Sequence, residues 1–276
     1  MTVPSSTPKP PLQREDLEHA SPAEVRLAIR EGRWTGNTKR LALGRHQANV
    51  TIVPKDVAFD FMRLCFRNPK ALPLLDVTEP GDPVPRRAAP GADLRTDVPG
   101  YRVYRDGELA EETTDVTAHW RDDLVAFLLG CSFTFERALL AEGLPVRHVE
   151  QGVNVPMYRT AIACRPAGRF AGPMVVSMRP MRAEQAIRAT QVTARFVRAH
   201  GAPVHVGDPA AIGIDDIDRP DYGDPVEIRD GEQPVFWACG VTPQAVATES
   251  RPELMITHAP GHMFVTDEAE ARQTAG

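Results

Sequence analysis

The segment GCSFTFE places Ser132 between two apolar stretches that we predict to be helices, and Glu136 on the first turn of the second one. Backbone N–H groups at the start of a helix bind anions, so the turn at Cys131 and Ser132 could stabilise an oxyanion. Ser132 could instead only cap the helix, with Cys131 in the core. Glu136 either compensates the helix dipole or exchanges protons. The segment therefore predicts an anion-binding turn with a carboxylate beside it.

Two arginines follow in segments where loops and strands meet. NVPMYRT carries Tyr158 and Arg159 where a loop passes into a strand, and VSMRP carries Arg179 near the end of another strand. A guanidinium binds a carboxylate through two parallel hydrogen bonds. We therefore expect Arg159 and Arg179 to hold a substrate carboxylate, with the phenol of Tyr158 beside them. The alternative for each arginine is a structural salt bridge.

Three histidines are candidates for proton transfer, because histidine titrates near neutral pH. His205 lies in PVHVGDP, and His258 and His262 lie in THAPGHMFVTD. A spacing of four would align two metal ligands on a helix, but the intervening Pro260 predicts a loop. His205 could instead be only packed or hydrogen-bonded. The pair could transfer protons, bind a metal or only shape the turn.

Cys239 lies where the predicted strand 235–238 breaks, before Thr242 opens a helix. At a strand end it could be a nucleophile of low pKa, or simply a small residue in a tight turn. The four cysteines of the chain are widely separated and include no C-x-x-C pair. We expect reduced thiols, most of them buried.

Capping residues and apolar periodicity predict the elements that position these groups. The predicted helices lie between Ser21 and Gly32 and at 55–68, 120–129, 135–142, 183–200 and from 242 onward. Strands are predicted at 47–54, 160–164 and 174–178 and near 204, 235 and 254, with a hairpin at 101–112 turning on Asp106-Gly107. In the helix over 183–200 the shared face is predicted to be Ile187, Thr190, Ala194 and Val197.

Helices alternate with strands and hairpins, which predicts an α/β fold or mixed α+β, with mixed β-sheets and packed helices. We expect one domain over 16–270, either a compact unit or two intertwined lobes at 16–130 and 131–270. Tails are predicted at 1–15 and 271–276. The Pro- and Gly-rich stretch 71–100 is predicted to be a linker or a loop shaped for function.

Composition and charge limit the classes of molecule that this protein is expected to bind. The 276 residues carry a formal net charge of -5, which gives no general electrostatic reason to bind nucleic acid or an anionic membrane. No apolar run approaches the length of a membrane span, and the first residues lack a secretory signal, so we expect a cytoplasmic protein. No motif implies an organic cofactor. We expect a small-molecule partner, and the sequence is compatible with a homo-oligomer.

The segments quoted above form an ordered set along the chain. Two further segments belong to this set, QANVTIVPKDVAFDF and RNPKALPLLDVTEPGDP. Together they resemble the bacterial hydro-lyase family grouped with the D-glutamate cyclases, from about Ser21 to Asp267. Some relatives convert D-glutamate to 5-oxo-D-proline with loss of water. The resemblance implies a carbon–oxygen lyase that acts on an amino acid or a related carboxylate.

Water loss needs a proton acceptor, a proton donor and groups that hold the carboxylate. On this hypothesis Arg159 and Arg179 hold the carboxylate, and His205 acts in proton transfer with His258 or His262. One alternative is a metal-assisted hydrolase centred on His258 and His262. Another is a binding module without catalysis that holds a metabolite related to 5-oxoproline.

Overall fold

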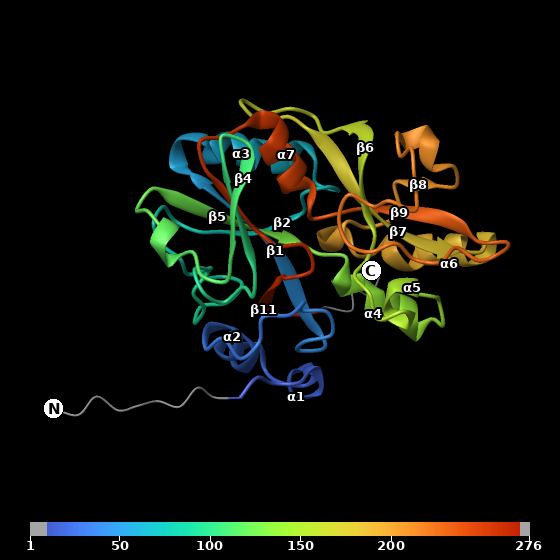
Figure 1. The fold of residues 1–276 in the computed structure, drawn as a ribbon, viewed down its shortest axis with the longest axis horizontal. Helices are drawn as coiled ribbons and strands as arrows, with labels where there is room; N and C mark the ends of the chain where they lie inside the picture. Colours follow the sequence, from blue (N-terminus) through green and yellow to red (C-terminus); the bar gives the residue numbers. More distant parts are fainter. Residues whose placement is uncertain (1–9, 271–276) are drawn as a thin grey trace.

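The computed structural model describes residues 10–270 and confirms the α/β fold class, with helices packed on two β-sheets (Figure 1). Most of the predicted tail 1–15 and all of the predicted tail 271–276 lie outside the described residues. Helix α1 (Arg14–Glu18) begins within the described part of the first tail. None of the helices within 10–270 combines the length and the apolar character needed to cross a lipid bilayer.

Sheet A has seven strands in the described part of the chain, and every pair in it is antiparallel. The order is β2-β5-β1-β10-β3-β4, and β11 also pairs with β1. The strands are β1 (Arg45–Pro54), β2 (Leu74–Val77), β3 (Tyr101–Arg105), β4 (Glu108–Thr113), β5 (Leu124–Gly130), β10 (Met255–His258) and β11 (Phe264–Ala269). Sheet A therefore takes strands from both of the predicted lobes.

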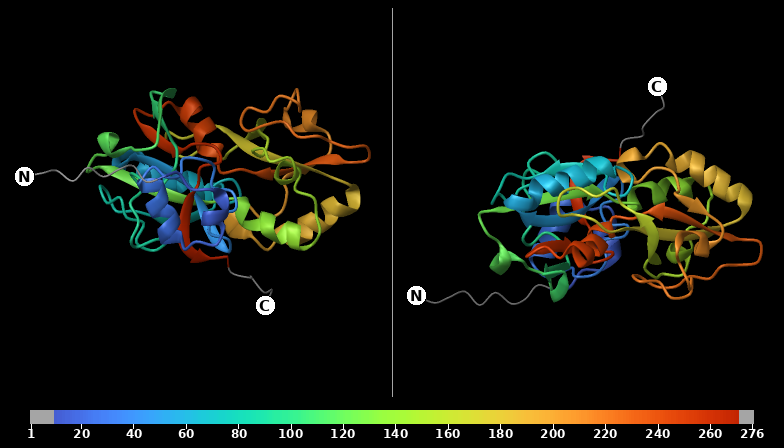
Figure 2. Two further views of the ribbon diagram at one scale, coloured as in Figure 1. Left: turned by 60° about the horizontal axis from the view of Figure 1, so that its bottom comes forward. Right: turned by 90° about the horizontal axis from the view of Figure 1, so that it is seen from above.

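Sheet B has four strands among the described residues, in the order β6-β7-β9-β8, and is also antiparallel. Its strands are β6 (Met157–Ala163), β7 (Pro173–Met181), β8 (His205–Val206) and β9 (Gln233–Ala238). Seen from above, the two sheets with their helices form two bodies side by side (Figure 2). The chain enters sheet B after β5 and returns to sheet A at β10.

The helices cover the sheets and join them. Helix α3 packs on β1 and β5, α4 packs on β1 and α6, and α7 contacts both β7 and β10. The remaining contacts place α2 on β11 and α5 on β7. The bounds are α2 (Pro22–Arg30), α3 (Lys55–Arg67), α4 (Phe133–Ala141), α5 (Arg147–Glu150), α6 (Ala183–Thr193), α7 (Thr242–Ser250), η1 (Thr117–His119), η2 (Val197–Ala199) and η3 (Pro209–Ile212).

Two helix predictions are confirmed together with their physical basis. Ser21 and Glu24 form the capping box of α2, in which the Ser21 backbone N–H donates to Glu24 Oε2 at 2.8 Å. In α3 the buried residues are the four predicted on its apolar face: Val57, Phe61, Leu64 and Cys65. Capping residues and apolar periodicity were enough to predict both helices, because each helix packs one face on a sheet.

The predicted hairpin is confirmed as β3 and β4. Asp106 has φ 50° and Gly107 has φ 85°, so both central residues of the turn are left-handed. This is the geometry that an Asp-Gly pair favours in a two-residue hairpin. The side chain of Arg251 lies against Gly107, and its carbon Cγ would stand 2.7 Å from an added Cβ.

The predicted helix 120–129 is wrong: most of that segment is strand β5. All seven residues of β5 are buried, and the strand lies between β1 and β2 in sheet A. A short apolar run that is buried on both faces has no alternation to distinguish a strand from a helix. GCSF therefore lies between a strand and a helix, not between two helices.

The predicted helix 183–200 is too long, and its predicted face is wrong. Helix α6 ends at Thr193, and its buried residues are Ala186, Ala189, Val192 and Thr193. Ile187 and Val197 are 64% and 62% exposed. Small residues face the neighbouring helix α4 because they allow two helices to approach closely, and this packing outweighs the preference for burying larger side chains.

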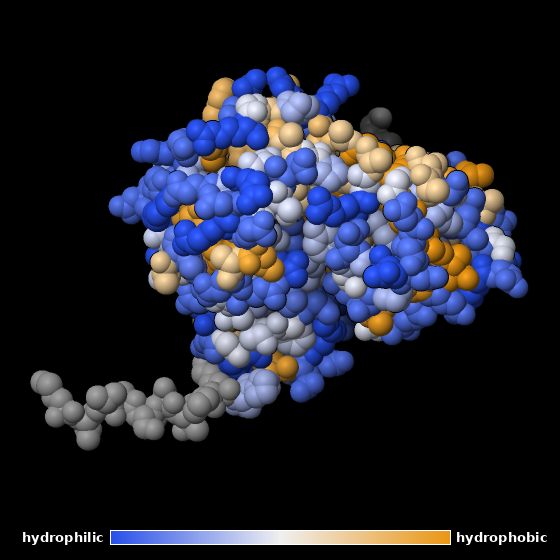
Figure 3. Space-filling view, turned by 45° about the horizontal axis from the view of Figure 1, so that its top comes forward, coloured by the Kyte–Doolittle hydropathy of each residue, from blue (hydrophilic) through white to orange (hydrophobic). Residues whose placement is uncertain are grey.

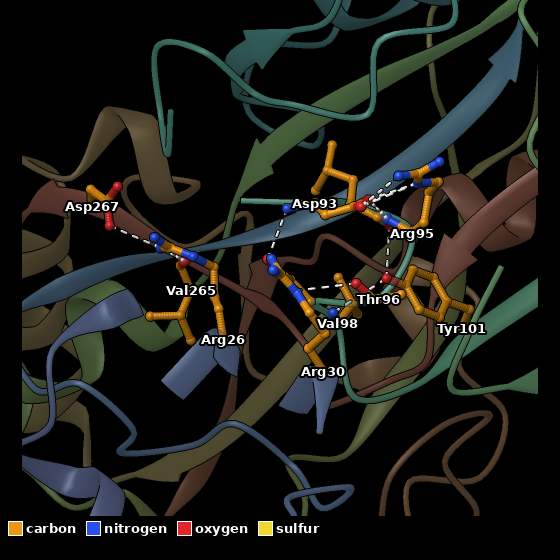
Figure 4. A network of polar contacts seen from close by, with 11 residues as sticks. Arg26, Arg30, Asp93, Arg95, Thr96, Val98, Tyr101, Val265 and Asp267 are labelled. Atoms are coloured by element: carbon orange, nitrogen blue, oxygen red, sulfur yellow. Dashed lines mark hydrogen bonds and ion pairs between the residues drawn. The ribbon is translucent and has the colours of Figure 1, made fainter. Parts of the chain in front are cut away.

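The stretch 71–100 folds against sheet A. Apart from β2 it has little regular structure, yet it contributes buried alanines and Leu94 and Val98 to the core. Arg30 donates twice to Asp97, both at 2.8 Å, and the Tyr101 hydroxyl donates to the Leu94 carbonyl at 2.7 Å. Figure 4 shows Arg30 and Tyr101 within this polar network. The stretch is therefore a fixed part of the fold and not a linker between domains.

The surface is mainly hydrophilic on the face drawn in Figure 3, where apolar side chains stand in separate groups. The most exposed large apolar side chains of the described residues include Phe66, at 86%, and Phe59, at 64%, both on α3. Scattered apolar side chains are ordinary on protein surfaces. The predicted homo-oligomer stays a prediction.

Candidate functional site

The GCSF turn joins β5 to α4 and carries the first polar residue of the site. Ser132 occupies the position before α4, but its side chain makes no capping hydrogen bond. Its hydroxyl instead accepts a hydrogen bond from Arg179 Nη2 at 3.2 Å. Ser132 is 3% exposed. The helix-cap alternative for Ser132 is therefore not what the structure shows.

Arg179 on β7 is fully buried and surrounded by partners. Its Nη1 donates to Ser177 Oγ at 3.0 Å, and its Nη2 donates to Glu136 Oε1 at 2.5 Å. The guanidinium carbon lies 5.2 Å from the ring centre of Phe135 and 5.4 Å from that of Trp237. A guanidinium suits such a place because its plane stacks on rings while its edge binds a carboxylate.

Glu136 also faces His148 of α5, with Oε1 3.2 Å from Nε2. Burial alone raises the pKa of Glu136, but His148 and Arg179 outweigh it and hold the pKa at about 2. Burial lowers the pKa of His148, although Glu136 acts against it. Both ring nitrogens of His148 are buried without a well-aligned hydrogen bond among the described residues, so Nε2 meets Glu136 as a charge contact. We name Glu136, His148 and Arg179 the buried cluster.

A cavity of about 220 Å³ lies beside the buried cluster, between α4 and the loop that precedes β1. Glu136 lines it together with four cationic side chains, Lys39, Arg40, Arg45 and Arg137. Glu270 also lines it, 3.8 Å from Arg137, and burial raises the pKa of Glu270 to about 7. We call this the cationic cavity. Its charge suits a small anionic ligand.

The loop along the cationic cavity has an uncommon backbone. Arg40 and Ala42 have φ angles of 65° and 46°, in the left-handed region that residues other than glycine rarely adopt. Backbone strain of this kind concentrates at functional sites. Lys39 Nζ donates to the His148 carbonyl at 3.2 Å, and burial lowers the pKa of Lys39. Sequence reasoning missed both Lys39 and His148.

The two cysteines of the candidate site are protonated thiols. Burial raises the pKa of Cys131 to about 12 and that of Cys239 to about 11. All four cysteines of the chain are free and buried, as expected. A thiol reacts as a nucleophile when it loses its proton. The structure therefore gives no support to Cys239 as a nucleophile of low pKa.

Comparison with known proteins identifies the family. The sequence model described as D-glutamate cyclase matches residues 125–267, which contain the whole buried cluster. A protein of Stutzerimonas stutzeri, provisionally named a hydro-lyase, is 65% identical over 247 residues, which cover 90% of this chain and 93% of that protein. The chain belongs to the D-glutamate cyclase family. Lys39 precedes the residues that the family model matches, but the match to this relative covers nearly the whole chain.

Other relatives of this D-glutamate cyclase family member carry the same provisional name. The protein of Bordetella petrii is 65% identical over 248 residues, covering 90% of this chain and 94% of its own. That of Thermoanaerobacter sp. is 61% identical over 255 residues, covering 92% and 96%. A solved structure of a nitrogen repressor-like protein from Methanococcus jannaschii has a TM-score of 0.34 at 8% identity, covering 91% of this chain and 99% of its own.

In this D-glutamate cyclase family member, His205 and Tyr158 face away from the buried cluster. His205 on β8 pairs with Phe236, which pairs in turn with Met178, the residue before Arg179. Neighbouring residues of a strand point to opposite faces, so His205 and Arg179 lie on opposite faces of sheet B. Tyr158 contacts Phe236 on the His205 side, and its hydroxyl donates to the Ile217 carbonyl at 2.6 Å.

Arg159 is also apart from Arg179. It lines another cavity, of about 530 Å³, together with Arg219 and three carboxylates, those of Asp215, Asp216 and Asp221. The carboxylates outnumber the two arginines in that cavity, so it is less suited to an anionic ligand. The structure therefore does not bring the two predicted carboxylate-binding arginines together.

His258 and His262 stand near the largest of the three cavities, of about 650 Å³, which His262 lines. Glu112, Asp221 and Asp224 line it as well, so it is less suited to a carboxylate than the smaller cationic cavity. His258 is buried, with Nδ1 3.3 Å from the Val50 backbone nitrogen. Within residues 10–270 no group of three or more His, Cys, Asp or Glu is placed to hold a metal ion.

Gly130 allows the GCSF turn to approach η2 closely. A Cβ at Gly130 would lie 1.6 Å from the Arg198 carbonyl oxygen. We predict that Gly130→Ala lowers the free energy of unfolding by about 1–3 kcal/mol in urea titrations, because the backbone must move apart. Gly91→Ala is the matched control, since nothing lies within 4 Å of its added Cβ. Equal effects of the two substitutions would show that this close approach is unimportant.

Buried histidines predict acid sensitivity. Burial lowers the pKa of His200 and of His258 from 6.5 to about 4. Between these pH values the unfolded chain binds protons that the folded chain does not bind. The free energy of unfolding is therefore highest above pH 6.5 and falls as the pH falls toward 4. Each shift corresponds to about 3 kcal/mol in full. Glu136 acts in a lower window, from 4.5 down to about 2.

The measurement is urea unfolding at about pH 7 and about pH 5. We expect wild type to lose about 4 kcal/mol between them, because the fall to pH 5 crosses only part of the range between 6.5 and about 4. His258→Gln should lose clearly less, whereas the exposed His19 replaced in the same way should behave like wild type. An unchanged pH dependence in His258→Gln contradicts the assignment.

Proposed function

We propose that this chain removes water from a small amino-acid-like carboxylate, with D-glutamate to 5-oxoproline as the foremost reaction, in the reducing cytoplasm. The observation that carries the proposal is the cationic cavity, which four basic side chains line beside the buried cluster. Its volume of about 220 Å³ suits a small metabolite. Membership of the D-glutamate cyclase family and relatives provisionally named hydro-lyases support the same chemistry.

The amino nitrogen of glutamate attacks the γ-carboxyl carbon, a C–N bond forms and one C–O bond breaks. The ammonium group gives up two protons, which leave with one γ-carboxylate oxygen as water. The site must therefore hold two carboxylates, accept protons from nitrogen and deliver protons to oxygen.

Lys39 is the proton-transfer group in this proposal. It lines the cationic cavity, and burial lowers its pKa from the ordinary 10.5, although Glu136 acts against this. A lysine tuned in this way can accept a proton from an amine and return it to a departing oxygen. Arg137 and Arg45 bind the carboxylates from the same cavity.

The buried cluster positions the cavity wall. Arg179 fixes the carboxylate of Glu136 from behind, and His148 holds the same oxygen from α5. Glu136 has a pKa of about 2, so it stays an anion beside Lys39 and is a poor proton acceptor. We therefore assign Glu136 and Arg179 to positioning, in place of the direct carboxylate binding expected of Arg179.

An NMR time course tests this function. Purified protein is incubated with D-glutamate, L-glutamate or 5-oxoproline, each with and without added divalent metal. We expect 5-oxoproline to form from one glutamate enantiomer faster than in protein-free buffer. Tight binding without turnover under every condition would instead favour the binding-module alternative, and neither binding nor turnover would remove glutamate as the substrate.

A further inference from the structure

The outward face of helix α3 carries three apolar side chains in a line. Phe59, Met62 and Phe66 are 64%, 40% and 86% exposed. Their spacing of three and four residues puts them on one side of the helix, opposite the face that packs on β1 and β5. A helix packed on a sheet normally exposes polar side chains on its outward face. An exposed apolar stripe at this spacing marks α3 as a candidate docking surface.

Arginines flank this apolar stripe. Two come from α3 and two from the loop at 165–169, and all are exposed or half-exposed: Arg63, Arg67, Arg165 and Arg169. The loop is fixed to α3, because the Asn68 side chain donates to the Arg165 carbonyl at 2.9 Å and the Arg169 backbone N–H donates to Asp60 at 3.2 Å. We name the stripe and the four arginines the basic apolar patch.

The positive charge of the basic apolar patch is only partly compensated. Asp60 pairs with Arg63 at 3.3 Å, whereas Arg67 donates to a backbone carbonyl of the loop, which is uncharged. The segments 55–67 and 165–169 together contain five Lys or Arg and two Asp, a sum of +3, although the whole chain carries -5. Within a Debye length of about 10 Å, this face therefore attracts an anionic partner.

We propose that the basic apolar patch docks this protein reversibly on an anionic lipid bilayer, with the aromatic rings among the headgroups and the arginines at the phosphates. The stripe from Phe59 to Phe66 is roughly 10 Å long. A stable protein–protein interface takes about 800 Å² from each partner and needs a matching shape. A bilayer needs neither, so it fits this small, protruding stripe better than a protein partner does.

Vesicle flotation tests the proposal, with vesicles of equal parts phosphatidylglycerol and phosphatidylcholine and with vesicles of phosphatidylcholine alone. In about 0.1 M salt we expect wild type to bind the anionic vesicles at least about tenfold more tightly. Replacing both Arg165 and Arg169 by glutamine should weaken this binding at least about tenfold, because each cation contributes about fivefold. Phe66→Ser should weaken it about fivefold. Ile187→Ser, at a 64% exposed position on α6, is the control and should match wild type.

Equal binding of wild type to both kinds of vesicle overturns the proposal, and so does a Phe66→Ser variant that binds as tightly as Ile187→Ser. Absence of binding to either kind of vesicle also overturns it and would favour an acidic protein as the partner. Phe66 is 86% exposed and both loop arginines are exposed, so these variants should fold as wild type does. The proposed function stands or falls separately, since none of these residues lines the cationic cavity.

Discussion

Replacement of Arg179 by methionine is expected to lower the free energy of unfolding by about 3–5 kcal/mol, because it leaves a buried carboxylate without its cation. Arg179 is fully buried, and Glu136 is 5% exposed. Without the guanidinium, His148 is the ion-pair contact that the carboxylate keeps among the described residues. Urea unfolding near neutral pH measures the loss.

Two variants make this prediction specific. Glu136→Gln in the Arg179→Met background removes the unpaired charge and should restore at least half of the lost stability. Arg159→Met, on the neighbouring strand, should stay within about 0.5 kcal/mol of wild type, as surface substitutions usually do. If Arg179→Met is as stable as Arg159→Met, the buried cluster is not the electrostatic unit described above.

Replacement of Lys39 by methionine is expected to reduce turnover of glutamate by about 10²–10⁴-fold with little change in stability. Lys39→Arg keeps the positive charge but cannot exchange the proton at neutral pH. It should therefore retain KM and lose kcat. Steady-state kinetics over a range of pH makes the measurement.

The pH profile separates proton transfer from simple charge. The rate of wild type should rise with pH as Lys39 loses its proton below its ordinary pKa of 10.5, since burial lowers that pKa. This limb should be absent in Lys39→Arg. Lys55→Met, at an exposed site on α3, is the control and should match wild type. A normal kcat in Lys39→Arg would rule out proton transfer by this lysine.

Local signals were sufficient wherever an element packs one face on a sheet. The capping box of α2 and the apolar stripe of α3 are visible in the sequence and survive in the structure. The strand β5 was predicted to be a helix because LVAFLLG is apolar on both faces. Its place between β1 and β2 depends on partners distant in the chain, and periodicity carries no information about them.

The candidate site was predictable in its residue types but not in its assembly. Ser132, Glu136 and Arg179 were each singled out, yet their contacts join residues more than forty positions apart. Lys39 was not predicted to be a site residue, because a loop rich in basic residues is normally expected to be exposed to solvent. Its signal was the group of cations at 39–45 directly before the segment QANVTIVP.

The histidines were chosen in the sequence for their residue type, whereas their position in the fold decides whether they can belong to the site. His205 was singled out because it is a histidine, but strand register places it on the face of sheet B away from Arg179. His148 was passed over in the sequence, although it precedes the segment NVPMYRT by only a few residues. A histidine becomes a candidate through its neighbours, and those are set by packing.

The most direct test of the central claim is the electron density of a crystal soaked with D-glutamate. The account predicts the ligand in the cationic cavity, with its carboxylates at Arg45 and Arg137 and its amino group beside Lys39. Ligand density beside His262 or Arg159, with the cationic cavity empty, would contradict it.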